Sequence, residues 1–302
     1  MFRTINLRQA IPTLVVLVVL GLSAQPASAL FENTTHNPKA RGMGEAGVTV
    51  IDPAFAVMVN AAQLGSITRG EATATYVQPF GYSFNNSFFL GVAVPIDPKY
   101  GNVGFGISQF AVNYEDVSLQ KETRYSLGHG FPLYADMHSS VDFGYSLNLY
   151  HAELGETVTG DNPGSDTAFG IDLGLLITLH KRTRLGFQIY NINNPDIGVD
   201  DEELGRRLVA GISYEPYDGV ITTFEFDNEL GQELQYHGGV AMTVVTGFQL
   251  RVGILTNPNK LTGGFGYTFD GLSLDYGFST GGGTLNNTHQ FGLKFAWGGE
   301  AQ

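Results

Sequence analysis

The side chains that could do chemistry are scattered along this chain. Its seven histidines show no i, i+2 or i, i+4 pairing, the spacing that places two metal ligands on one face of an element, and the chain has no cysteine. Ser108, Ser126, Ser146 and Ser213 have no motif around them that would supply a base and an orienting group. We therefore expect no enzyme, no bound metal and no cofactor.

Two glycine pairs and the overall charge exclude further classes. Gly42 and Gly44, like Gly264 and Gly266, are not followed by a helix start that would present amides to a phosphate. The formal charge is −13, which argues against nucleic acid, because phosphates require basic patches.

Ten charged residues fall in the middle of predicted strands, five acidic and five basic. All have the parity opposite to that of the large apolar residues, so they should share one face of a sheet. Inside a barrel such charges can pair, which would rigidify the wall; alternatively, they line a water path. They are Arg124, Asp142, Asp172, Arg184, Arg207, Glu225, Asp227, Arg251, Asp275 and Lys294.

Segments with period-two alternation recur along the chain, separated by turn residues, as an all-β antiparallel meander barrel requires. An even number of strands, each long enough to cross a bilayer at a tilt, is typical of bacterial outer-membrane barrels. The fourteen predicted strands are 67–80, 86–95, 100–113, 117–129, 138–153, 167–180, 183–193, 206–215, 219–228, 232–245, 247–256, 260–269, 271–280 and 287–298.

The predicted connections alternate between short and long. The exception is Phe131–Met137, a longish turn on the side of the short connections, which we expect to be periplasmic. Leu147, Leu250 and Leu274 exemplify the apolar parity, which should face lipid. Tyr76, Phe89, Phe110 and Tyr190 are candidates for the inner surface, and His151 and His237 could also fall on lumen walls.

The two ends of the chain carry export signals. Arg3 and Arg8, a short apolar run and Ala27-Ser28-Ala29 predict a signal peptide over residues 1–29, cut after Ala29. No later segment has the apolar run of a spanning helix, so membrane residence requires a barrel. The last strand ends in a polar, Gly and aromatic pattern that resembles the signal read by the barrel-assembly machinery, carried by Gln290, Gly292, Phe295 and Trp297.

An N-terminal motif completes the pattern. Arg41-Gly42-Met43-Gly44-Glu45-Ala46-Gly47-Val48 is followed by Asp52 and by Asn60-Ala61-Ala62. This order resembles the signature of the superfamily of FadL-type hydrophobic-compound transporters and PorV/PorQ-type outer-membrane proteins. The chain is closer in length and C-terminal motifs to the PorV/PorQ branch. Other matches are Phe169–Gly174, Gln188–Ile192, Leu250–Gly253, Leu274–Phe278 and Thr288–Phe291.

The resemblance implies a plug. Residues 30–65 would fold into the barrel mouth from the periplasmic side, and residues 66–302 would form the barrel. The plug motif comprises Gly42, Met43, Gly44, Ala46, Gly47, Asp52 and Asn60. The family's Asn-Pro-Ala is Asn60-Ala61-Ala62 here, so the proline that stiffens the junction is absent.

Three functions fit these features. The first is FadL-like uptake of hydrophobic small molecules across the bacterial outer membrane. The second, implied by the PorV/PorQ resemblance, is a scaffold or cargo-binding barrel in a type IX-like protein secretion system, with acidic outer loops at residues 155–166 and 194–205. The third is a structural barrel without transport. Expected partners are outer-membrane lipids and lipopolysaccharide, the barrel-assembly machinery, and either a hydrophobic ligand or secretion proteins.

Overall fold

The structure is a computed structural model that describes residues 30–31, 35–97, 99–115, 117–156, 164–198, 202–282 and 285–298. The predicted signal peptide lies outside the described residues. No helix within the described ranges is long and apolar enough to cross a membrane.

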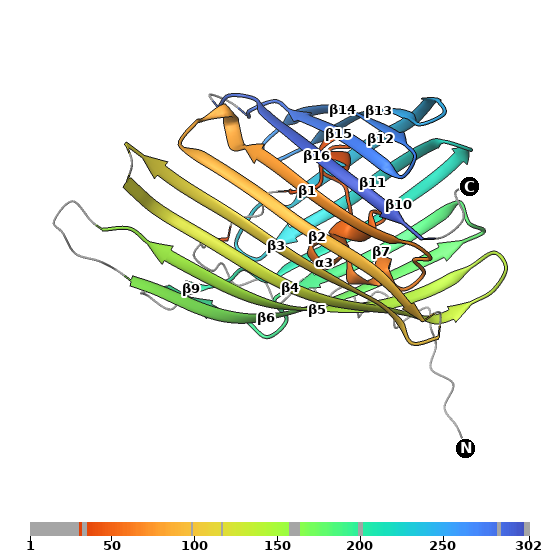
Figure 1. Cartoon of the computed structure of the whole chain (residues 1–302), viewed down its shortest axis with the longest axis horizontal. Coiled ribbons are helices and arrows are strands. Elements are labelled where there is room, and N and C mark those ends of the chain that lie inside the picture. The colour runs from red at the N-terminus through yellow and green to blue at the C-terminus, as the bar shows by residue number, and fades with distance from the viewer. Residues whose placement is uncertain are drawn as a thin grey trace, which may run out of the picture.

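Fourteen strands in the described part of the chain close into one antiparallel barrel, which confirms the predicted fold class (Figure 1). Each strand pairs with the next along the wall, and β16 closes the ring on β1. The strands are β1 (Gly70–Gln78), β2 (Asn85–Asp97), β3 (Gly101–Tyr114), β4 (Val117–Ala135), β5 (Ser140–Leu154), β6 (Gly164–Leu179), β7 (Thr183–Tyr190), β10 (Arg207–Tyr217), β11 (Val220–Glu229), β12 (Gln235–Val245), β13 (Phe248–Leu255), β14 (Lys260–Phe269), β15 (Leu272–Ser279) and β16 (Thr288–Trp297).

The two ends of the barrel differ. Short turns join β2–β3, β4–β5, β6–β7, β10–β11, β12–β13 and β14–β15 at one end, which we call the turn end; we call the opposite end the loop end. At the loop end lie η3 (Pro79–Gly81) and a small sheet of β8 (Asp196–Ile197) and β9 (Glu202–Glu203).

The predicted long turn at Phe131–Met137 is wrong. The β4–β5 hairpin continues to the pair Ala135–Ser140, with a register shift between Pro132 and Tyr134. A β-bulge at this position accommodates one extra residue, so the strand continues although the period-two alternation is interrupted. A period-two pattern alone does not predict such a bulge. The true turn is tight, because Asp136 Oδ1 accepts the N–H groups of His138 and Ser139, both at 2.7 Å.

The two faces of the wall have opposite chemistry. Leu274, Val252 and Phe291 are 48%, 60% and 54% exposed on the outside, whereas the carboxylates of the charged set are buried inside. Such a continuous apolar exterior suits hydrocarbon, not water. The prediction that Tyr76 lines the inner surface is wrong. Tyr76 is 48% exposed and faces outward, while its neighbours in sequence, Thr75 and Val77, are buried on the lumen side.

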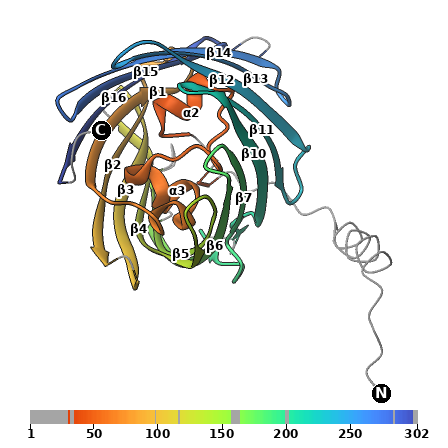
Figure 2. The same ribbon diagram turned by 90° about the vertical axis from the view of Figure 1, so that its right-hand side faces the viewer.

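The segment before β1 fills the lumen, where Figure 2 shows α2 and α3 enclosed by the strands. We call residues 35–69 the plug. It contains α2 (Pro38–Gly42), η1 (Pro53–Phe55), α3 (Ala56–Val59) and η2 (Ala61–Leu64). Asn37 caps α2 by accepting the N–H groups of Lys39 and Ala40 at 2.8 and 3.2 Å.

The plug extends further than the barrel mouth. Leu30 and Phe31, which precede it, pack near the loop end on a cluster that includes Ile197 and Leu204. The chain then reaches the turn end, where Ser66 Oγ donates to Asp142 Oδ1 at 2.6 Å. It therefore traverses the whole lumen before β1 begins.

Candidate functional site

The plug motif runs along the inner wall formed by β12 to β15, and the contact is between backbones. A Cβ on Gly239 would lie 2.3 Å from the Met43 carbonyl oxygen, and one on Gly253 would lie 2.1 Å from the Gly44 nitrogen. Gly44 has φ +72°, a conformation that favours glycine. Wall glycines such as Gly239 and Gly253 thus leave room for the plug backbone, and we call them the glycine track. Their inward parity in the sequence was consistent with this role.

Wall side chains satisfy the polar backbone of this motif. Gly44 N–H donates to Thr262 Oγ1 at 2.8 Å, and the Gly44 carbonyl accepts from His237 Nδ1 at 2.6 Å. Glu225 Oε2 accepts the N–H groups of Gly47 and Val48 at 3.0 and 2.9 Å. Ala46 is fully buried. Because buried backbone groups are costly when unpaired, these contacts hold the plug in register.

Asp52 joins the plug to the charged wall. Lys294 Nζ lies 2.8 Å from Asp52 Oδ1 and 3.7 Å from Asp275 Oδ2, and Arg251 Nη1 lies 2.7 Å from Asp275 Oδ1. Two predicted sets, the plug motif and the lumen charges, therefore meet in one chain of alternating charges.

Asn60 fixes the plug to the wall by side-chain hydrogen bonds, although the proline that follows it in the family's motif is absent here. Its Oδ1 caps η2 by accepting Ala62 N–H at 3.1 Å, and its Nδ2 donates to the Val48 carbonyl at 3.1 Å and the Leu175 carbonyl at 3.3 Å. The junction is therefore pinned to β6 by an amide.

Arg41 connects the plug to the wall, a contact that the sequence motif did not indicate. It is 4% exposed, and its Nε donates to Gln290 Oε1 at 2.5 Å. Its Nη1 donates to Ser279 Oγ at 3.1 Å and to Glu45 Oε1 at 3.0 Å. Gln290 and Gly292, from the predicted assembly signal, thus face the plug, while Phe295 and Trp297 lie on the outward face.

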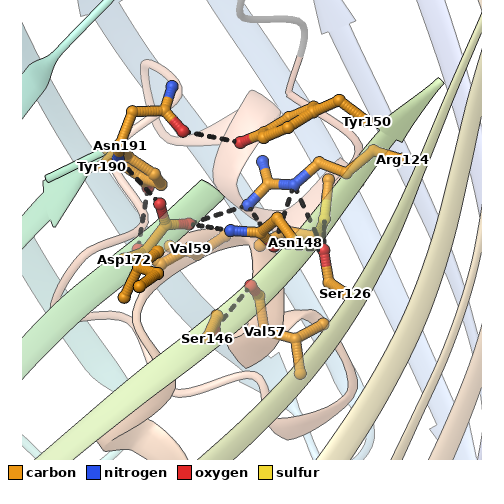
Figure 3. A network of polar contacts seen from close by, with 12 residues as sticks. Val57, Val59, Arg124, Ser126, Ser146, Asn148, Tyr150, Asp172, Tyr190 and Asn191 are labelled. Carbon is orange, nitrogen blue, oxygen red and sulfur yellow. Dashed lines mark hydrogen bonds and ion pairs between the residues drawn. The ribbon is translucent and has the colours of Figure 1, made fainter. Parts of the chain in front are cut away.

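A second group of charges lies nearer the loop end. Arg124 Nη2 donates to Asp172 Oδ2 at 2.9 Å, and Asn148 bridges the pair (Figure 3). Arg207 forms a bidentate ion pair with Asp227. Each guanidinium lies over a tyrosine ring, Arg124 over Tyr150 at 5.4 Å and Arg207 over Tyr190 at 4.9 Å.

Three members of the charged set stand apart from both groups: Asp142, Arg184 and Glu225, whose carboxylate accepts plug N–H groups instead. Asp142 accepts from Ser66 Oγ and from Ser140 Oγ, the latter at 2.8 Å. Arg184 faces inward with a buried Nε that has no hydrogen-bond partner in the described residues. Seven of the ten residues therefore form two ion-paired groups, and three side chains stand apart. Of the two histidines predicted on the lumen wall, His237 faces the lumen, whereas His151 has outward parity and contacts Thr167.

The plug forms part of the wall of two cavities. The loop-side cavity measures about 150 Å³ and is lined by aromatic and apolar side chains with several charged ones, among them Phe31, Phe55, Phe110, Tyr150, Tyr190 and Val209. The turn-side cavity measures about 460 Å³ and is lined mostly by polar groups, including Lys39, Asp52, Glu71, Arg251, Asp275 and Lys294.

His36 lies on the plug beside the loop-side cavity. Ser87 Oγ donates to the Gln109 carbonyl at 3.0 Å, so its contact with His36 Nε2 at 2.9 Å makes that nitrogen the donor. Burial lowers the pKa of His36 to about 3, and Arg41 and Arg124 add repulsion. The ring is therefore neutral at physiological pH. Among the described residues, no group of three side chains could hold a metal.

Solved barrels share this fold, although no protein-family model and no curated protein sequence matches the chain. The toluene transporter TodX of Pseudomonas putida matches with a TM-score of 0.61 at 12% identity, covering 88% of this chain and 99% of that one. The monoaromatic hydrocarbon channel CymD gives 0.58 at 14%, covering 87% and 97%. A Pseudomonas aeruginosa FadL homologue gives 0.56 at 12%, covering 88% and 99%. The chain thus has the fold of FadL-type outer-membrane barrels.

Proposed function

We propose that this barrel passes small hydrophobic molecules inward across the outer membrane. The observation that carries the proposal is the loop-side cavity, where the aromatic rings of Phe31, Phe55 and Phe110 gather beside charged side chains. Burial of apolar ligand surface there would drive capture without covalent chemistry. Shared fold with a toluene transporter and a monoaromatic hydrocarbon channel supports the same class of cargo.

The plug is the barrier in this proposal. Val48, Phe55 and Val59 of the plug line the loop-side cavity, whereas Asp52 and Pro53 line the turn-side cavity. A ligand in the first cavity touches the plug directly, so passage requires the plug to shift along its glycine track. The turn end would face the periplasm, and the polar turn-side cavity would serve as the exit.

Uptake into proteoliposomes tests the proposal. We expect radiolabelled toluene to enter vesicles that contain the barrel faster than vesicles that contain an unrelated outer-membrane barrel of similar size. Equal rates would refute transport and would favour the structural barrel without throughput.

A secretion role is the second candidate, supported by the PorV/PorQ-like motifs and by the exposed acidic residues Asp196, Glu202 and Glu203 of the β8–β9 sheet at the loop end. Affinity purification from outer membranes tests it. Recovery of a stoichiometric secretion component would support this role, and recovery of the barrel alone would count against it.

A further inference from the structure

The polar part of the loop-side cavity has more acidic than basic side chains. Glu45, Glu122, Glu225 and Glu229 line it, against Arg124 and Arg207. Glu122 on β4 accepts Phe31 N–H at 2.8 Å, whereas Glu45 belongs to the plug and is paired with Arg41. With the ion-pair partners Arg41, Asp172 and Asp227 included, acidic side chains still outnumber guanidinium groups by six to three around this cavity.

The two arginines do not reverse this balance. Arg207 is paired through Nε and Nη2 with both oxygens of Asp227, and Arg124 is paired with Asp172, which is fully buried. Since each guanidinium charge is compensated behind the cavity wall, a carboxylate ligand would meet net repulsion and would lose its hydration.

Two wall atoms keep hydrogen-bonding capacity. Glu225 accepts the N–H groups of Gly47 and Val48 through Oε2 alone, so Oε1 has no hydrogen-bond partner among the described residues. His36 donates through Nε2 to Ser87, which leaves Nδ1 as an acceptor in the neutral ring. Glu225 lines the cavity, so a ligand hydroxyl in the cavity could donate to its Oε1.

Size and shape restrict the ligand further. A cavity of about 150 Å³ is the size that accepts one benzene ring. Phe31 packs edge-on against Tyr150 with centroids 4.9 Å apart, and Phe55 stacks on Phe89 at 5.1 Å, so the apolar wall is made of fixed aromatic rings. Offset or edge contacts with such rings favour an aromatic guest.

We propose that the loop-side cavity selects a single-ring aromatic molecule that carries a hydroxyl group, and that it rejects aromatic carboxylates. This inference rests on the proposed function, because it names the ligand class of the same cavity. The ring occupies the aromatic wall, and the hydroxyl pairs with Glu225 Oε1 or His36 Nδ1.

Three fluorinated probes of nearly equal size test the selection. We would follow ¹⁹F NMR titrations of 4-fluorophenol, 4-fluorotoluene and 4-fluorobenzoate against the full barrel in lipid nanodiscs, with empty nanodiscs as baseline. We expect 4-fluorophenol to bind about fivefold more tightly than 4-fluorotoluene, the ratio that one net hydrogen bond provides. We expect 4-fluorobenzoate not to saturate.

Two outcomes would overturn the inference: 4-fluorobenzoate binding as tightly as 4-fluorophenol, or 4-fluorotoluene matching 4-fluorophenol. The ranking uses the unmutated protein, so it does not depend on a variant that folds. If toluene uptake persists while the ranking fails, only this inference falls. If aromatic compounds enter vesicles with this barrel and vesicles with the control barrel at equal rates, the proposed function falls.

A matched pair of variants locates the hydroxyl. Glu225→Leu removes a carboxylate that accepts plug N–H groups and lines the loop-side cavity. Glu71→Leu removes one that accepts Ala54 N–H at 3.2 Å but lines the turn-side cavity. We expect the phenol-to-toluene affinity ratio to fall to about one in the first variant and to persist in the second. A ratio lost equally in both would contradict the assignment to Glu225.

Discussion

At the residue scale, Lys294 compensates two carboxylates at once. Lys294→Met would remove the salt bridge of Asp52, and it would remove one of the two cations beside Asp275. Breaking a buried pair from one side typically costs about 3–5 kcal/mol, so we expect destabilisation of that order and a plug that docks poorly. Urea unfolding in lipid vesicles and single-channel conductance measure these two effects.

The control is an ion pair on the surface. Arg182 contacts Asp218 at 2.7 Å, but the two side chains are 46% and 93% exposed. Arg182→Met should cost at most about 1 kcal/mol. Equal losses in the two variants would show that the Asp52–Lys294 contact does not hold the plug.

The glycine track gives a second residue-scale prediction. Gly253→Ala would place a methyl group 2.1 Å from the Gly44 nitrogen, a distance that backbone atoms cannot accept, so we expect the plug to be displaced and open-channel conductance to rise. Gly263→Ala is the matched control on β14, since its Cβ would meet no atom closer than 3.7 Å. Closed channels in both variants would contradict the close approach.

At the element scale, the plug is expected to move against the wall. Thr49 Oγ1 lies 3.5 Å from Thr223 Oγ1, and the native chain has no cysteine. The double variant Thr49→Cys, Thr223→Cys should therefore form one disulfide between plug and β11. We expect oxidation to block toluene uptake and reduction to restore it. Uptake that is unaffected by the oxidised bond would exclude plug movement at this position.

Plug docking should also depend on pH through His36. Its pKa falls from the ordinary 6.5 to about 3 in the docked plug. The docked state is therefore fully favoured above pH 6.5 and loses stability as the pH falls toward 3. We expect conductance to rise on acidification and the rise to be smaller in His36→Asn. The same rise in the variant would assign the effect to other groups.

The sequence predicted the elements better than their contacts. Strict alternation placed every strand of the wall, because each residue there has one lipid side and one lumen side. The predicted orientation of Tyr76 was wrong because an aromatic ring suits the lipid side and the lumen side equally. The sequence also did not indicate the plug contacts of Arg41 with Gln290 and of His237 with Gly44. These pairs are 249 and 193 positions apart in the chain, and no local sequence pattern connects them.

At the scale of the whole molecule, the barrel depends on hydrocarbon covering its outer face. Leu274 is 48% exposed on that face, and Ser273 lines the turn-side cavity beside Asp275. Leu274→Arg should therefore cost about 2–4 kcal/mol of stability in a bilayer. Ser273→Arg should cost less, because its charge meets a polar lumen and a carboxylate. Urea titrations in vesicles compare the two variants directly. Equal costs would mean that the outward and inward faces do not differ as lipid and lumen do, and the transport proposal would lose its structural basis.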